Sequence, residues 1–271
     1  MVTESNFIEY KNSKLFYRKS GSGSKALLLF HGFGQNHQAF NAWDESLSAT
    51  YTLYTFDIFF HGQSEWPSTD MAIEKADWKG IMEAFFKTTH IERYSLVGFS
   101  MGGKFVLATL EAFPEKVHKI FLLAPDGIKT NFWYSLATYP IAFRNLFKSM
   151  IEKPNRFYAI ARFANKVGMI DKGILRFIES QMDTQEKRQR VYYSWVIFRH
   201  FKFEMTTIAR ILNENHIHVT MIIGKYDKII TTQNMNLLLN KLTSFNLKIL
   251  EAGHNGVIAQ STGLITPSNT I

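Results

Sequence analysis

Residues 94–112 read YSLVGFSMGGKFVLATLEA: a strand-like run, a Gly-x-Ser-x-Gly turn, and a helical run from Met101. A serine between a strand and a helix lies on a sharp, strained turn, so only small residues fit two positions on either side of it. Gly98 and Gly102 meet this requirement, and Gly103 permits close packing of the helix on the strand. The stretch therefore predicts a nucleophile elbow with Ser100 as the nucleophile.

Strand-like and helix-like segments alternate on both sides of this turn. A continuous apolar run such as Ala26–Phe30 is typical of a strand that is buried on both faces. The expected strands are the hairpin Phe7–Lys11 and Lys14–Arg18, then Ala26–Phe30, Tyr51–Phe56, Tyr94–Val97, Ile120–Leu123, Val219–Ile223 and Leu247–Leu250. The expected helices are Ala39–Leu47, Met71–Thr88 and Met101–Ala112. This alternation predicts an α/β fold, with a parallel sheet and helices on both faces.

The alternation stops after Ala124, and strand signals return only at His218. Residues 127–216 are almost entirely helical in pattern and include 16 aromatic residues. They also include 15 Lys and Arg against 7 Asp and Glu, an excess that equals the net charge of +8 of the whole chain. We therefore expect one core domain, formed by residues 1–126 and 217–271, with residues 127–216 as a helical insertion.

A glycine-rich turn, His31-Gly32-Phe33-Gly34, follows the buried run Ala26–Phe30. Such a turn at the end of a central strand lets a backbone N–H point into a cavity. Acyl transfer requires two such donors for the oxyanion of its tetrahedral intermediate, each contributing about 3 kcal/mol. We expect the N–H groups of Phe33 and Met101 to form this oxyanion hole.

Two polar residues follow strand-like runs near the end of the chain. Asp227 comes after residues 219–223 and His254 after residues 247–250. Both are expected at the carboxyl edge of the sheet, where open α/β sheets bind ligands. With Ser100 they occur in the order Ser, Asp, His, which is typical of this architecture. We expect His254 to act as the base for Ser100 and Asp227 to orient His254; Asp126, which also follows a strand, is the alternative acid.

Composition excludes several other kinds of site. The 271 residues include no cysteine, which removes disulfides, thiolate metal sites and a cysteine nucleophile. No His, Asp and Glu cluster has the spacing of metal ligands, so neither a metal nor an organic cofactor is expected.

The first ten residues contain no apolar run and the longest apolar runs are strand-sized, which predicts a cytoplasmic protein without signal peptide or membrane span. The cations lack a recognition motif for nucleic acid, and no such partner is expected.

Jointly, five motifs resemble those of the α/β-hydrolase superfamily, in its branch with a helical lid after strand six. They are HGFG (31–34), DIFFHGQS (57–64), GFSMGG (98–103), GKYDK (224–228) and AGH (252–254). The resemblance covers about residues 6–255. It implies a mostly parallel eight-stranded sheet with helices on both faces, a lid formed by residues 127–216, and a Ser100–His254–Asp227 triad.

Two features depart from the family pattern. Phe60 replaces the first glycine of the family's G-H-G-x-S turn, which Asp57 is expected to tie down through His61 and Ser64. Family members also carry a last helix after the histidine, whereas only 17 residues follow His254 and residues 261–271 predict an irregular tail.

The resemblance implies hydrolysis of a small or medium carboxylic ester with an apolar acyl group, by an acyl-enzyme mechanism. Alternatives with the same triad are cleavage of a carbon–carbon bond in a vinylogous diketone and a lyase of the menaquinone-pathway type; a non-catalytic ligand-binding protein is a further one. The lid is expected to pack its apolar side over the active site. The sharper hypothesis is that its basic, aromatic face attracts anionic surfaces or acidic substrates. No oligomeric state is implied.

Overall fold

The computed structural model describes residues 3–68, 71–129, 132–166, 168, 175, 179, 180 and 182–265. The chain forms two units. The sheet unit comprises Met1–Pro67, Glu74–Lys129 and Phe201–Ile271, and the helical unit comprises Ser68–Ile73 and Thr130–His200.

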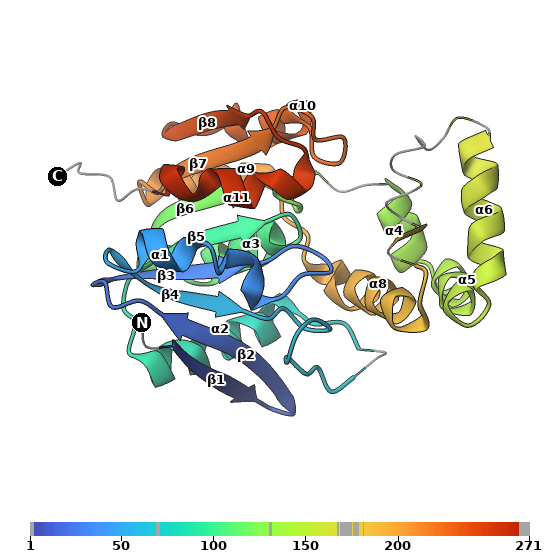
Figure 1. Ribbon diagram of the computed structural model, residues 1–271, viewed down its shortest axis with the longest axis horizontal. Coiled ribbons are helices and arrows are strands. Elements are labelled where there is room, and N and C mark those ends of the chain that lie inside the picture. The colour runs from blue at the N-terminus through green and yellow to red at the C-terminus, as the bar shows by residue number, and fades with distance from the viewer. Residues whose placement is uncertain are drawn as a thin grey trace. The chain divides into compact units, whose positions relative to one another are not determined.

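One sheet of eight strands organises the sheet unit (Figure 1), in the order β1-β2-β4-β3-β5-β6-β7-β8. The strands are β1 (Thr3–Tyr10), β2 (Ser13–Ser20), β3 (Lys25–Phe30), β4 (Tyr51–Phe56), β5 (Tyr94–Phe99), β6 (Val117–Leu123), β7 (His218–Gly224) and β8 (Phe245–Leu250). The first two pairings, β1 with β2 and β2 with β4, are antiparallel, and all others are parallel. The predicted mostly parallel eight-stranded α/β sheet is therefore confirmed.

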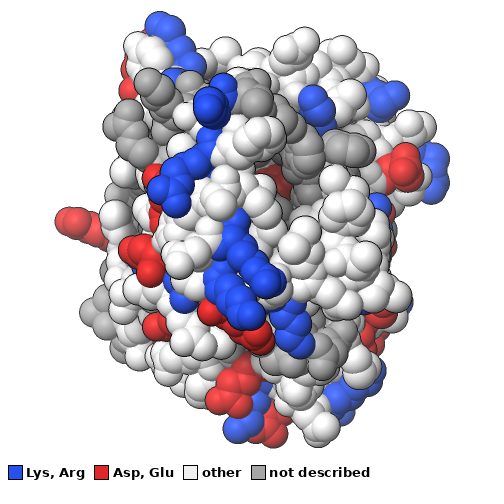
Figure 2. Space-filling view, turned by 90° about the vertical axis from the view of Figure 1, so that its right-hand side faces the viewer, with Lys and Arg blue, Asp and Glu red and all other residues white. Residues whose placement is uncertain are grey.

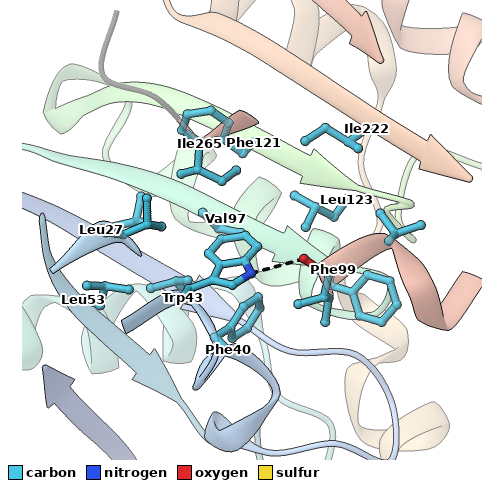
Figure 3. Packing of buried hydrophobic residues seen from close by; sticks show 14 of the residues in the cluster. Leu27, Phe40, Trp43, Leu53, Val97, Phe99, Phe121, Leu123, Ile222 and Ile265 are labelled. Atoms are coloured by element: carbon cyan, nitrogen blue, oxygen red, sulfur yellow. Dashed lines mark hydrogen bonds between the residues drawn. The ribbon is translucent and has the colours of Figure 1, made fainter. Parts of the chain in front are cut away.

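The apolar runs are continuous because both faces of the sheet are covered. Within β3, Leu27 and Leu29 belong to a buried cluster with Trp43 on one face. Phe30, which points the other way, packs against Trp78 and Phe105, with ring centroids 5.8 and 6.3 Å away. Figure 3 shows the first cluster, in which Trp43 lies among side chains of several strands. Alternate residues of a strand face opposite sides, so a strand between two helical layers needs apolar residues at every position.

Six α-helices and several 3₁₀ turns are described in the sheet unit. The α-helices are α1 (Trp43–Leu47), α2 (Lys75–Thr89), α3 (Gly102–Ala112), α9 (Met205–Glu214), α10 (Thr232–Leu239) and the short α11 (Val257–Ser261), with a 3₁₀ turn (His37–Phe40) before α1. The helix expected over Met71–Thr88 begins only at Lys75. Glu74 is its N-cap, and the side chains of Glu74 and Asp77 form a reciprocal capping box. That box satisfies the first free N–H groups of the helix and defines its start.

The segment after His254 is more ordered than the sequence indicated. Residues 257–264 form α11 and a 3₁₀ turn, and Val257, Ile258 and Ile265 are buried in the cluster around Trp43. The indole Nε1–H of Trp43 donates a hydrogen bond of 3.1 Å to the Ile258 carbonyl, drawn as the dashed line in Figure 3. The expectation of an irregular tail was wrong for residues 261–265, because apolar side chains dock them on the sheet; residues 266–271 lie outside the described part.

The helical unit has a small core of its own. Its helices are α4 (Phe132–Thr138), α5 (Ile141–Glu152), α6 (Pro154–Lys166) and α8 (Gln185–Ile197), followed by a 3₁₀ turn (Phe198–His200). Phe147 and Ile151 of α5 pack against Tyr192 and Val196 of α8. The buried Arg188 side chain donates to the carbonyl of Ile151 at 3.0 Å and so caps the end of α5.

The boundaries of the helical unit differ from the inserted segment expected over 127–216. Residues 201–216, which include α9, belong to the sheet unit, and Ser68–Ile73 belongs to the helical unit, where the Ile73 N–H donates to the Ile197 carbonyl at 3.0 Å. The reason is packing: α9 buries Ile208 and Leu212 and contacts α3 and α10 of the sheet unit. Within the described residues, no helix has both the length and the apolar character needed to cross a bilayer.

Candidate active site

Ser100 lies at the turn between β5 and α3 in a left-handed backbone conformation, with φ of +49°. This conformation is unfavourable for a residue with a side chain. Three backbone hydrogen bonds hold it: Ser100 N–H donates to Leu123 O at 2.9 Å, and Ser100 O accepts from the N–H groups of Gly103 at 2.9 Å and Asp126 at 2.8 Å. The turn that exposes the serine is thus tied to the end of β6 on one side and to α3 on the other.

The glycines around Ser100 lie where no side chain fits. A Cβ on Gly98 would come within 2.6 Å of Val106 Cγ2, and one on Gly102 within 2.1 Å of the Phe30 carbonyl oxygen. A Cβ on Gly103 would lie 2.6 Å from the Asp126 carbonyl oxygen. Real Cβ atoms do not approach so closely, so these positions require glycine for close approach of the backbones.

His254 connects Ser100 to Asp227 through both of its ring nitrogens. Its Nε2 lies 3.0 Å from Ser100 Oγ, and its Nδ1 lies 2.6 Å from Asp227 Oδ2. Asp227 Oδ2 accepts from Nδ1–H, which leaves Nε2 as the acceptor toward the serine hydroxyl. The Asp227 side chain is fully buried and that of His254 is nearly so. The structure therefore brings together the three residues that the sequence predicts.

The other oxygen of the Asp227 carboxylate is also fixed. Asp227 Oδ1 accepts from the N–H groups of Ile229 at 2.8 Å and Ile230 at 2.9 Å. These two amides satisfy the oxygen that does not face His254, and they leave Oδ2 directed at the imidazole. A carboxylate held by all these hydrogen bonds has a fixed position and orients the ring of His254.

Asp126, the alternative acid, is directed elsewhere. Its Oδ2 forms an ion pair with Lys104 Nζ at 2.9 Å, and its Oδ1 accepts from the Gly127 N–H at 2.7 Å. Its side chain keeps 39% exposure, in contrast to the buried Asp227. Its backbone N–H, however, donates to Ser100 O, so Asp126 braces the elbow through its main chain.

The two predicted oxyanion donors are available. Within the described residues, neither the Phe33 N–H nor the Met101 N–H donates to an acceptor of the chain. The loop that holds Phe33 is closed by Gln35: its side-chain Oε1 accepts from Gly32 N–H at 3.0 Å, and its N–H donates to Gly32 O at 3.3 Å. Sequence reasoning missed Gln35, although its spacing of three residues from Gly32 is that of a tight turn.

His31, at the start of the same loop, is a neutral structural histidine. Its Nε2 accepts from the Ile58 N–H at 2.9 Å, so its Nδ1 carries the proton that it donates to the Gly32 carbonyl at 2.7 Å. Complete burial, and secondarily the neighbouring His61, lowers the pKa of His31 to about 3. His31 therefore joins the loop after β3 to the turn after β4 without carrying charge.

The turn after β4 is held by the buried Asp57, for which sequence reasoning found the partner Ser64 but missed the partner His37. The Asp57 carboxylate lies 2.9 Å from His37 Nδ1 and also accepts from the N–H groups of His37 and Gln63; Ser64 Oγ binds the Asp57 carbonyl instead. No local pattern could reveal His37, which lies 20 residues away. Phe60, at the family's glycine position, has φ of +67°, the left-handed conformation that favours glycine.

Taken together, the strand order, the elbow after β5 and the hydrogen-bonded Ser100, His254 and Asp227 are those of an α/β hydrolase. The family model described as the alpha/beta hydrolase fold matches residues 25–259, and the chain belongs to this family. The resemblance to the α/β-hydrolase superfamily is thereby confirmed, and the predicted enzyme class, a hydrolase, agrees with it. Among the described residues, no group of His, Asp or Glu is arranged to hold a metal ion.

Individual proteins that resemble this chain share little sequence identity with it or match only part of its length. A thermophilic esterase from Thermogutta terrifontis shares the fold, with a TM-score of 0.70 and 14% identity over 97% of this chain and 96% of its own. An uncharacterized protein of Mycobacterium tuberculosis is 32% identical over 127 residues, which are 46% of this chain and 36% of that protein. A Mycoplasma pneumoniae protein with the provisional name esterase/lipase 3 is 26% identical over 125 residues, 44% of each chain. The chain thus matches less than half the length of these two curated relatives.

Proposed function

We propose that this protein is a serine hydrolase that cleaves a small or medium carboxylic ester with an apolar acyl group. The observation that carries the proposal is the continuous hydrogen-bonded path from Ser100 Oγ through His254 to the buried Asp227 carboxylate. A serine hydroxyl is a weak nucleophile until a neighbouring base removes its proton, and this path supplies the base and the group that orients it. The names of distant relatives, which include an esterase/lipase, support the same reaction class.

In the first half of the reaction, His254 Nε2 takes the proton of Ser100 as Oγ forms a bond to the acyl carbon. The carbonyl oxygen becomes an oxyanion, which the N–H groups of Phe33 and Met101 stabilise. The bond to the alcohol oxygen then breaks, and His254 returns the proton to the leaving alcohol. The acyl group is left as an ester of Ser100.

In the second half, water takes the place of the alcohol. His254 removes a proton from water as its oxygen attacks the acyl carbon, and the same two N–H groups hold the second oxyanion. When the bond to Ser100 breaks, the serine recovers its proton from His254 and the carboxylic acid leaves. We assign the choice of acyl group to the helical unit as a lid, because the chain leaves for it from the loop after β6, at the edge where Ser100 lies.

The test is labelling of the purified protein with a fluorophosphonate, which reacts with activated serines. We expect the protein to be labelled and the variants Ser100→Ala and His254→Ala to remain unlabelled while their circular dichroism stays unchanged. Labelling that survives in Ser100→Ala, or a folded wild-type protein that is not labelled at all, would contradict the proposal. The latter outcome favours a non-catalytic ligand-binding role.

Substrate panels then define the bond that is cleaved. We expect turnover of p-nitrophenyl esters with unbranched aliphatic acyl chains, and none by the Ser100→Ala variant. A vinylogous diketone panel is the matched comparison. If the diketones are cleaved with far higher kcat/KM than any ester, the triad serves carbon–carbon bond hydrolysis and the ester assignment is wrong.

A further inference from the structure

The excess positive charge of the helical unit is concentrated on α5 and α6. From Ile141 to Lys166 the chain has six basic residues and one acid, Glu152. The 13 residues of α6 contain no acid at all. A helix surface with one sign of charge repels itself unless something of the opposite sign neutralises it.

In the same unit, cations on α8 are paired with acids. On α8 and just before it, Lys187 pairs with Asp183 and Arg190 with Glu186, each at 2.9 Å and one turn apart. On α6, Arg156 donates to the Ser149 hydroxyl at 3.3 Å and Arg162 donates to the Tyr158 carbonyl at 3.1 Å, and both acceptors are neutral. Among the described residues, no acid pairs with either arginine or with Arg144 or Lys166.

The same face of α6 exposes large apolar side chains. Ala161 faces inward and is buried, whereas Ile160 is 48% exposed and Phe163 is 65% exposed. Arg156, Ile160 and Phe163 follow one another at intervals of four and three residues, which places them on one stripe of the helix. On α5, Ile141, Phe143 and Leu146 are exposed as well. Two aromatic and three aliphatic side chains of α5 and α6 are thus exposed, and within the described residues the neighbouring Arg156, Arg162 and Lys166 meet no acid.

Figure 2 shows one face of the molecule, with Lys and Arg in blue and Asp and Glu in red. Lys and Arg side chains form a group near the middle of this face, with uncharged surface on both sides and some acidic side chains next to them. We propose that this face of α6, defined by Arg156, Ile160, Arg162, Phe163 and Lys166, docks on the surface of an anionic phospholipid bilayer. The cations would approach lipid phosphates while Ile160 and Phe163 enter the boundary between headgroups and acyl chains.

A bilayer fits these observations better than a dissolved anion does. Helices that lie in a membrane interface combine a cationic polar surface with exposed aromatic and aliphatic residues. A soluble anion would neutralise the cations and leave Ile160 and Phe163 in water, whereas an anionic bilayer satisfies both. The inference does not depend on the esterase proposal, because it uses no residue of the Ser100 site.

Co-sedimentation of the full chain with lipid vesicles tests the inference. We expect binding to vesicles of phosphatidylglycerol in phosphatidylcholine, little binding to pure phosphatidylcholine, and weaker binding as salt is added. Each interfacial cation contributes about fivefold in partitioning, so the triple variant R156Q/R162Q/K166Q should bind on the order of 100-fold more weakly. The matched control K87Q/K241Q/K248Q removes the same charge from exposed lysines of the sheet unit and should bind as the wild type does.

Three further variants make the test specific. The variant I160S/F163S keeps every charge and should lose binding too, whereas F245S/I249S, which alters exposed apolar residues of β8, should not. The variant R144K/R156K/R162K keeps the charge and should retain binding, and Ser100→Ala should bind normally. The inference is overturned if pure phosphatidylcholine binds equally well or if the two triple-Gln variants lose binding equally. It is also overturned if the wild-type protein binds no vesicles and the only effect of I160S/F163S is a loss of self-association.

Discussion

Two aspartates occupy equivalent places in the sequence and do different things in the structure. Asp126 is the third residue after the end of β6, and Asp227 is the third residue after the end of β7, the neighbouring parallel strand. Asp227 is directed at His254, and Asp126 is directed at Lys104. Position at the carboxyl edge of the sheet is therefore not sufficient to identify the acid of the site.

The difference comes from what each loop is bonded to. The Asp227 loop is joined to the loop that carries His254: Lys225 N–H donates to Leu250 O at 2.8 Å, and Tyr226 N–H donates to Ala252 O at 3.0 Å. The Asp126 loop is instead joined to the elbow, through its N–H bond to Ser100 O. One loop thus positions the base and the other positions the nucleophile, although both start from the same edge.

The largest effect is expected at Asp227. In Asp227→Asn, the amide oxygen can still accept from Ile229 and Ile230, but the NH₂ group then faces His254 and selects the wrong tautomer. We expect kcat to fall about 10⁴-fold with an unchanged fold, on the best ester found in the substrate panel. Steady-state kinetics and circular dichroism measure this. A loss of less than tenfold would mean that Asp227 does not orient His254.

His31 is a buried histidine whose ring is hydrogen-bonded to backbone groups, whereas the ring of His254 is bonded to a carboxylate. Burial lowers its pKa to about 3 in the folded protein, with His61, Asp57 and His37 as its charged or titratable neighbours. The unfolded chain gains this proton near pH 6.5 and the folded protein does so only near pH 3. The contribution of the neutral His31 to the free energy of unfolding is therefore complete above about pH 6.5. It is lost as the pH falls toward 3, by on the order of 4 kcal/mol.

The control for this pH dependence is His31→Gln, which cannot titrate. Urea unfolding of both proteins from about pH 7 down to about pH 4 should show the stability advantage of the wild type shrinking as the pH falls. Because all other titrating groups are common to both proteins, their contributions cancel in the difference. A difference that stays constant or grows would contradict the neutral state assigned to His31.

A smaller effect is expected where the Asp126 loop meets the elbow. In Gly103→Ala, the new Cβ would lie 2.6 Å from Asp126 O and 2.7 Å from Pro125 Cβ, so the loop must move away from α3. We expect a loss of about 1 to 3 kcal/mol in the free energy of unfolding. The matched change beside the base is Gly253→Ala, which meets nothing within 4 Å and should be neutral or stabilising by up to about 1 kcal/mol. Equal losses in the two variants would show that the contact at Gly103 is not the cause.

The smallest effect is expected at the Asp126 side chain. Asp126→Asn removes the charge that Lys104 meets and keeps an oxygen for the Gly127 N–H. We expect about 1 kcal/mol of lost stability and a change in kcat of less than about fivefold, because the brace on Ser100 is made by the main chain. A loss of activity as large as that of Asp227→Asn would reverse the assignment of the two acids.

Much of the architecture could be predicted because it depends on local patterns. The central strands, such as β3 and β5, correspond to apolar runs because they are covered on both faces, whereas the edge strands β1 and β8 are largely exposed. The start of α2 was displaced by four residues because the capping box of Glu74 and Asp77 is a matter of side-chain hydrogen bonds. The helical turns after His254 were missed because their stability comes from Trp43 and the sheet, more than 200 residues earlier in the chain.

The sequence by itself determined the strands, the glycines that the elbow requires, and the order in which Ser100, Asp227 and His254 occur. These are properties of residue type and spacing, on which sterics and hydrophobic periodicity act directly. Only the tertiary structure decided which acid faces His254, which histidine pairs with Asp57, and which cations of the helical unit meet no acid. These partners are brought together by the paths of loops between distant segments, and their identity depends on hydrogen bonds and burial that exist only once the chain has folded.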